Sequence, residues 1–297
     1  MVGGKGMKRS RGENVFNFFN ILFMLFLMVI MIYPLWYVVV ASLSKPFELM
    51  AYQDILLLPL GFNLDSYKAV IENPNILVGY KNTIFIVVVG TGLNILMTLL
   101  AAYGLSRKNL ALGRAITLMI VFTMYFGGGL IPTFLNIRQL GLYDSIFSLI
   151  IPGAISTTNM IILRTAIKAV PDSLEESAKL DGATHLQILF RIIFPLTLPT
   201  IAVLVLYYGV GHWNSWFSAA IYLRDRTKYP LQLFLREILT SNSMDAMMMN
   251  TDMEDKAMIA ETIKYAVIVV STLPILLLYP FLQKYFVKGV MIGSVKG

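Results

Sequence analysis

Six long apolar segments restrict what this 297-residue chain can fold into. About 20 apolar residues in a helix cross the hydrocarbon core of a bilayer. Hydrophobic residues make up 57% of the chain and charged residues 14%, whereas soluble domains carry roughly 25% charged residues. The pattern predicts an all-α, polytopic transmembrane bundle of six helices, forming one domain over residues 1–297. The expected spans are 15–43, 82–105, 115–135, 145–168, 192–222 and 262–286.

The positions of the basic residues predict the orientation of the bundle. Lys5, Lys8, Arg9 and Arg11 precede the first span, and the short segment 106–114 carries three more basic residues and no acid. Because Lys and Arg accumulate in cytoplasmic segments, we expect both termini in the cytoplasm. The first apolar run is about twice as long as the apolar region of a signal peptide, which favours an uncleaved span.

Several functions lack the residues that they require. The chain has no cysteine, and its two histidines are far apart, so no disulfide and no zinc site of the usual spacing is expected. It contains no G-x-x-x-x-G-K-[ST] motif, so it is not expected to bind ATP itself. An intramembrane hydrolase would need H-E-x-x-H, G-x-S-x-G or paired intramembrane acids, and none is found. The net charge of +7 fits basic helix ends facing anionic lipid better than a nucleic-acid partner. We predict no cofactor.

Glycine and proline interrupt two of the spans. Gly127, Gly128 and Gly129 with Pro132 break the third span near its outer end. This break is either a kink at the outer surface or a flexible element near a gate. The fourth span contains Pro152-Gly153. A Met-rich run, 244–249, lies in the loop before the last span, and we assign it no function.

A polar stretch, 172–195, lies between the fourth and fifth spans. Ser173 with Glu176, and Thr184 with Gln187, have the spacing of helix capping boxes, and Gly182 lies between them. The stretch therefore predicts a helix, a glycine turn and a second helix at the cytoplasmic face. A helix lying on lipid would be rich in Lys and Arg. This stretch is net acidic, which favours a protein partner with basic residues.

The same stretch resembles the EAA loop of bacterial ABC importer permeases. Their pattern is E-A-A, three residues, G, nine residues and I-x-L-P; this chain has Glu176-Ser177-Ala178, Gly182 and Ile192-Ile193-Phe194-Pro195 at that spacing, with Ser for the first Ala and Phe for the Leu. Trp213-Asn214 and the tail segments 283–289 and 293–297 are similar to the carbohydrate-uptake branch, which is maltose-type or polysaccharide-type.

The resemblance implies the function and the partners. The chain would be a permease subunit of an oligosaccharide importer in the bacterial cytoplasmic membrane, paired with a second homologous permease. Two ATPase subunits would hydrolyse ATP, and an extracytoplasmic solute-binding protein would deliver the sugar. The residues expected to couple to the ATPase are Glu175, Glu176, Ser177, Ala178, Asp181 and Gly182. The alternative is a sensory or scaffold membrane protein that keeps the permease fold without transporting.

Aromatic and polar residues gather at the outer half of the fifth span. Aromatic faces stack on sugar rings and amides bind hydroxyls, so this end is a candidate substrate pathway. The candidate residues are Tyr207, His212, Trp213, Asn214 and Trp216. An aromatic belt at the membrane interface would also explain Trp216, but it explains the polar side chains less well. Beyond this end, Arg224, Arg226 and Lys228 could steer an acidic sugar or lie among the headgroups.

Overall fold

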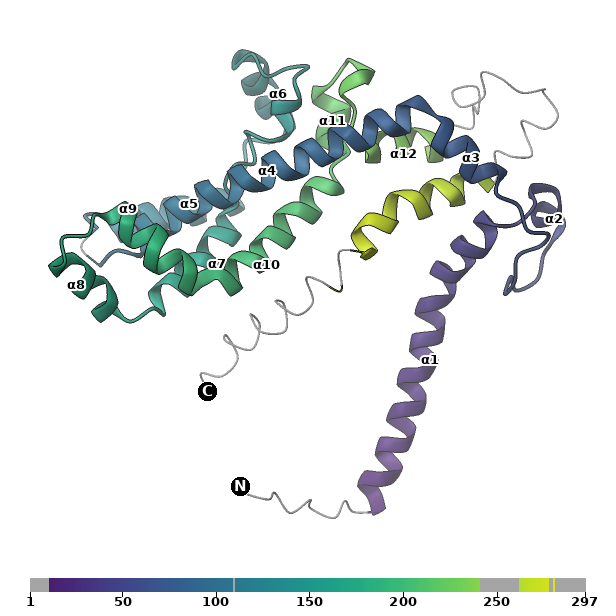
Figure 1. Cartoon of the computed structure of the whole chain (residues 1–297), viewed down its shortest axis with the longest axis horizontal. Helices are drawn as coiled ribbons and strands as arrows, with labels where there is room; N and C mark the ends of the chain where they lie inside the picture. Colours follow the sequence, from purple (N-terminus) through teal and green to yellow (C-terminus); the bar gives the residue numbers. More distant parts are fainter. Residues whose placement is uncertain (1–10, 109, 241–261, 278–279, 281–297) are drawn as a thin grey trace. The chain divides into compact units, whose positions relative to one another are not determined.

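The computed structural model describes residues 11–108, 110–240, 262–277 and 280, and the part described is helical, without strands. Figure 1 shows the helices and their labels. The longer ones, in chain order, are α1 (Arg11–Ser42), α4 (Pro74–Ser106), α5 (Gly113–Tyr125), α6 (Leu130–Gln139), α7 (Thr157–Lys168), α10 (Phe194–Trp213) and α12 (Leu231–Thr240). The shorter ones are α2 (Pro46–Ala51), α3 (Asp65–Glu72), η1 (Ile146–Leu149), α8 (Asp172–Leu180), α9 (His185–Ile188), η2 (Leu189–Ile193), α11 (Phe217–Tyr222) and η3 (Arg226–Lys228).

Three of the described helices are long and apolar enough to cross a membrane: Gly12–Ser42, Pro74–Ser106 and His185–Trp213. The helix Thr262–Leu277 is apolar but shorter. The Met-rich run 244–249, the tail segments 283–289 and 293–297, and the basic residues before Ser10 lie outside the described residues, as do the termini.

The second span begins earlier than the sequence pattern indicated. Helix α4 starts at Pro74, eight residues before the expected boundary at residue 82. Asn73 caps this start, because its side chain accepts a hydrogen bond from the Asn75 backbone N–H at 2.9 Å. Proline is well suited to the first helical position, where its missing N–H removes no hydrogen bond.

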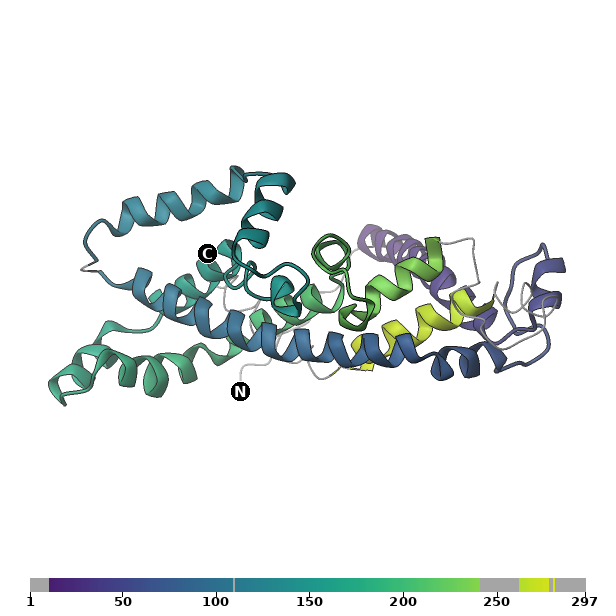
Figure 2. The same ribbon diagram turned by 90° about the horizontal axis from the view of Figure 1, so that it is seen from above.

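The break in the third span is confirmed. Helices α5 and α6 meet at an angle of 114°. Figure 2 shows the sharp bend between them. Gly129 lies between them with φ +85°, a conformation that disfavours residues with a Cβ. Pro132 is accommodated in the first turn of α6, where it costs no internal hydrogen bond.

The prediction of one helix over residues 145–168 was wrong. The segment contains the 3₁₀-helix η1, a turn around Pro152-Gly153, and α7, which begins only at Thr157. The Ser156 side chain caps α7 by accepting from the Asn159 N–H at 3.4 Å. Proline disrupts a helix, so the chain unwinds here and leaves backbone carbonyls available to other partners.

The prediction of one helix over residues 192–222 was also wrong. Helix α10 ends at Trp213, and α11 is a separate short helix. At its other end α10 continues backward through a π turn, η2, into α9. The π turn lies just before Pro195, whose ring would clash in a regular α-helix with the carbonyl four residues earlier, that of Arg191. The wider turn relieves this clash.

The described chain divides into two units. In the first, made of Met1–Glu72 and Ser243–Val270, the C-terminal end of α1 packs Val40 and Ala41 against Leu49 and Leu56. The rest of α1 is apolar on all sides and exposed, which is typical of a helix in lipid.

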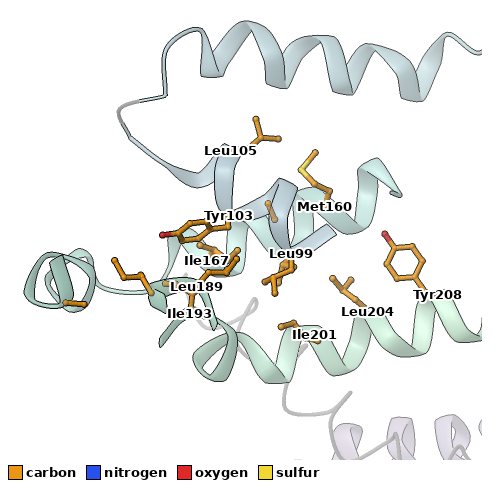
Figure 3. Packing of buried hydrophobic residues seen from close by; sticks show 14 residues of the cluster. Leu99, Tyr103, Leu105, Met160, Ile167, Leu189, Ile193, Ile201, Leu204 and Tyr208 are labelled. Carbon is orange, nitrogen blue, oxygen red and sulfur yellow. The ribbon is translucent and has the colours of Figure 1, made fainter. Parts of the chain in front are cut away.

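The second unit, Asn73–Asn242 and Ser271–Gly297, contains the main core. Helix α4 packs along α10 and α7, and a buried apolar cluster joins them. Figure 3 shows the packing of Leu99 with Leu204, and of Tyr103 with Ile167 and Leu189, near one end of α4. The short helices α8 and α9 lie beyond this end of the core.

Candidate functional site

The polar stretch forms the predicted hairpin of two short helices, α8 and α9. Gly182 ends α8 in the left-handed conformation, with φ +79°. Its N–H donates to the Lys179 carbonyl at 3.0 Å, and the Ala183 N–H donates to the Ala178 carbonyl at 2.9 Å. This pair of bonds is a Schellman motif, which terminates the helix and directs the chain into the turn. The predicted helix end at Gly182 is therefore confirmed.

One of the two predicted capping boxes is present. The Thr184 side chain accepts from the Gln187 N–H at 3.3 Å, and the Gln187 side chain accepts from the Thr184 N–H at 2.8 Å. The box predicted at Ser173 and Glu176 was wrong. Pro171 takes the N-cap position of α8 instead, which places Ser173 inside the first turn.

The hairpin packs against the core through a small apolar side. Ala178 of α8 and Ile188 of α9 are buried in the same cluster as Leu189. Leu180 points the other way and is 90% exposed. The apolar side of α8 therefore depends on Ala178, and Leu180 is available to a partner.

Ion pairs attach α8 to the segment that follows α4. Glu175 accepts from the Arg107 guanidinium, and its second oxygen lies 3.0 Å from Nζ of Lys179. Nearer the start of α8, Asp172 accepts from the Lys108 ammonium. The hydrogen bond and the positive charge of Lys108 lower the pKa of the Asp172 carboxyl.

The remaining polar residues of the hairpin face outward. Glu176, Ser177, Asp181 and Gly182 are exposed. The six predicted coupling residues therefore divide into two groups. Glu175 and Ala178 hold the hairpin to its own chain, and the four exposed residues form a surface that carries two carboxylates. A basic cleft on a partner could bind and displace such a rigid, acidic protrusion.

The candidate pathway residues do not form one cluster. His212 and Trp213 turn into the unit: Nε2 of His212 lies 2.7 Å from Oδ1 of Asn94, and the Trp213 indole donates to the Ser271 carbonyl at 3.2 Å. Tyr207 and Asn214 are exposed, and Asn214 is the C-cap of α10. Trp216 lies between the helices α10 and α11.

Basic side chains that follow Trp216 in the chain have partners within the chain. The Arg236 guanidinium lies 3.6 Å from the centre of the Trp216 ring, a cation–π contact. Arg226 pairs with Glu237 at 2.7 Å, and Lys228 pairs with Asp144 at 3.0 Å. Of the three basic residues that could steer a sugar or lie among the headgroups, Arg226 and Lys228 thus form ion pairs within the chain.

Sequence reasoning missed a line of buried polar contacts between α4, α10 and the start of α7. Asn94, which is fully buried, donates to the Gly153 carbonyl at 2.6 Å. Further along, the hydroxyls of Thr98 and Tyr208 lie 2.7 Å apart, and the Ser156 N–H donates to Tyr208 at 3.0 Å. We call these contacts, with the Asn94–His212 bond, the polar seam.

The polar seam had a signal in the sequence. Thr91, Asn94 and Thr98 stand three and four residues apart, so they share one face of an otherwise apolar helix. Polar groups in a span tend to face the bundle interior. The partners on α10 and near Gly153 were not predictable, because they depend on how separate helices pack.

The structure describes no group of three or more His, Cys, Asp or Glu side chains that could hold a metal ion in residues 11–108, 110–240 and 262–277. The described residues form a capped hairpin attached to helices that contact each other through buried polar groups. Such an arrangement is suited to transmitting movement.

Known proteins are similar to this chain over most of its length. The family described as "Binding-protein-dependent transport system inner membrane component" matches residues 85–292. The polygalacturonan/rhamnogalacturonan transport system permease protein YtcP of Bacillus subtilis (strain 168) is 42% identical over 270 residues, covering 90% of this chain and 93% of that protein. Protein LplC of the same organism is 40% identical over 292 residues, covering 98% of each chain.

A solved structure agrees with these relatives. The crystal structure of a bacterial ABC transporter involved in the import of the acidic polysaccharide alginate has a chain that is 32% identical, with a TM-score of 0.86. The match covers 94% of this chain and 99% of that one. Relatives of this kind are transport components without a catalytic site, and ATP is hydrolysed on a separate subunit. This chain belongs to the family of inner membrane components of binding-protein-dependent transport systems, as a permease subunit of an ABC importer.

Proposed function

We propose that this chain carries acidic oligosaccharides across the bacterial cytoplasmic membrane as one half of a permease heterodimer. YtcP is named for polygalacturonan and rhamnogalacturonan, and the transporter of similar structure is described as importing alginate. Two related permeases with acidic polysaccharide cargoes support a cargo of the same class here. The other expected partners are two ATPase subunits and an extracytoplasmic solute-binding protein.

The single observation that carries the transport role is the hairpin α8–α9. It is fixed to the bundle by Ala178 and Glu175, and it presents Glu176, Asp181 and Gly182 outward. We propose that this exposed surface, with Ser177, enters a cleft of the ATPase subunit. We also propose that the chain forms one permease domain with both termini in the cytoplasm, an orientation that the basic segment 106–114 supports.

Exposure divides the proposed pathway residues. Tyr207, Asn214 and Trp216 retain accessible aromatic or amide surface that can meet a sugar. His212 and Trp213 direct their polar atoms at Asn94 and at the Ser271 carbonyl, so we propose that they shape the pathway from behind.

Reconstitution in proteoliposomes with the second permease, the ATPase and the binding protein tests this function. We expect ATP-dependent uptake of labelled oligogalacturonate that exceeds the uptake of a neutral oligosaccharide of equal length. Uptake of the neutral sugar alone would contradict the acidic cargo. Stimulation of ATP hydrolysis with no uptake of either sugar would contradict transport and favour the sensory alternative.

A further inference from the structure

The C-terminal end of α4 holds one arginine in a fixed position. Arg107 is the C-cap of this helix. Its Nε donates to the Tyr103 carbonyl at 3.2 Å, and its Nη2 donates to the Ser106 hydroxyl at 2.8 Å. The guanidinium also lies 4.2 Å from the centre of the Tyr103 ring. These contacts use the rigid, planar fork of the arginine, so its direction is set by its own helix end.

The same end of α4 contacts both helices of the hairpin. The remaining Arg107 nitrogen donates to Glu175 of α8, and the Tyr103 hydroxyl lies 3.3 Å from Nδ1 of His185 at the start of α9. The Arg107 and Glu175 side chains are only 22% and 13% exposed. Burial of this kind makes a charge-assisted hydrogen bond stronger than an ion pair on an open surface.

The neighbouring pair provides an internal comparison. Lys108 and Asp172 also join the two segments, but their side chains are 79% and 59% exposed. Exposed pairs contribute little to stability, because water screens the two charges. Of the two ion pairs, the one between Arg107 and Glu175 therefore contributes more to the attachment between α4 and α8.

We propose that Arg107 and Glu175 are positioning residues that make the hairpin and α4 move together. A displacement of the hairpin by the ATPase would then reach α4 directly, and through α4 the polar seam at Asn94 and Thr98. The inference rests on the proposed transport function. It assigns Glu175 to a contact within the chain, whereas the neighbouring Glu176 faces outward.

The same movement could also pass through α10, and the two routes lead to different predictions. Helix α9 continues through η2 into α10 without a break in the backbone. If α10 alone received the displacement, the Arg107–Glu175 pair would only support the fold. Its loss would then lower transport and ATP hydrolysis in parallel, through the amount of assembled transporter.

The test measures substrate imported per ATP hydrolysed by the complete reconstituted transporter. We expect Arg107→Glu and Glu175→Arg each to lower this ratio by about tenfold, because each places like charges together where a strong charged pair stood. The double variant Arg107→Glu/Glu175→Arg restores the attraction and should recover most of the ratio. Arg114→Glu reverses a charge at an exposed position at the start of α5 and should leave the ratio unchanged.

Two results would overturn the inference. One is an unchanged ratio in both single variants; the other is a double variant that stays as low as the singles. Should the charge reversals not assemble, Glu175→Gln and Arg107→Lys keep the shape or the charge and should still lower the ratio by about threefold. Absence of uptake by the unsubstituted transporter would instead contradict the proposed function.

Discussion

Single residues of the polar seam illustrate how a membrane bundle uses hydrogen bonds. Thr98 and Thr91 are both buried on the same face of α4. The Thr98 hydroxyl bonds to Tyr208, whereas the Thr91 hydroxyl has no hydrogen-bond partner in the described part of the chain. A buried hydroxyl without a partner carries a desolvation cost that a methyl group avoids.

The two threonines give a matched prediction. Thr98→Val removes a hydrogen bond and leaves Tyr208 with one partner fewer, so we expect a loss of about 1 kcal/mol in the free energy of unfolding. Thr91→Val makes the same chemical change and should be neutral or slightly stabilising. Denaturation of the purified chain in mixed micelles measures both. Equal losses for the two variants would show that the Thr98–Tyr208 bond contributes nothing.

Asp144 is the residue through which pH should act on the segment 224–228. Its carboxylate accepts from the backbone N–H groups of Asp225 and Arg224 at 3.0 and 2.9 Å, and from Lys228 at 3.0 Å. These hydrogen bonds, the one from Asp225 first, lower the pKa of Asp144 to about 2. The folded pKa lies below the unfolded value of about 3.9, so the contribution is complete above that value.

We predict that this stabilisation is lost as the pH falls from about 4 through 2. Asp144→Asn keeps a residue that tolerates the positive φ of 56° at this position but cannot ionise. The melting temperature of the wild-type chain should exceed that of Asp144→Asn at pH 5, and the difference should shrink toward pH 2. A difference independent of pH would contradict the assignment.

At the scale of elements, the sequence predicted local features well and helix continuity poorly. The Gly182 helix end, the Thr184–Gln187 cap and the break at Gly127–Gly129 each depend on residues close in the chain. The helix expected over 145–168 failed because Pro152-Gly153 unwinds it, and the freed Gly153 carbonyl is satisfied by Asn94 on another helix. Average hydrophobicity could not reveal that a distant amide compensates for the break.

The hairpin turn yields an element-scale prediction. No atom of the described residues beyond the chain neighbours lies within 4 Å of a Cβ added at Gly182, so within this chain a substitution there acts through the left-handed backbone. Gly182→Ala should cost about 1–2 kcal/mol in the hairpin and lower ATP-dependent uptake, while Gly182→Asn should lower it less because Asn tolerates this conformation. Uptake assays on the reconstituted transporter compare the two. A greater loss with Asn would mean that the position requires small size rather than positive φ.

At the scale of the whole molecule, the sequence was sufficient for the family and for the hairpin whose exposed surface we propose to meet the ATPase. The spacing from Glu176 through Gly182 to Pro195 identified the hairpin before any contact was known. The sequence could not show which of two adjacent acids faces inward. That depends on Arg107 being held at the end of α4, some 68 positions earlier in the chain.

Substitutions at the two adjacent acids therefore allow an effect on transport to be distinguished from an effect on folding. Glu176 is exposed, whereas Glu175 is paired with Arg107 and Lys179. Glu176→Lys should leave the melting temperature of the purified chain unchanged, because exposed surface substitutions usually change stability by less than about 0.5 kcal/mol. In the assembled transporter it places a positive charge toward the basic partner, and uptake should fall by at least about tenfold. Glu175→Lys, the matched control, should lower the melting temperature as well as uptake. A Glu176→Lys transporter with normal uptake would show that this carboxylate does not meet the ATPase.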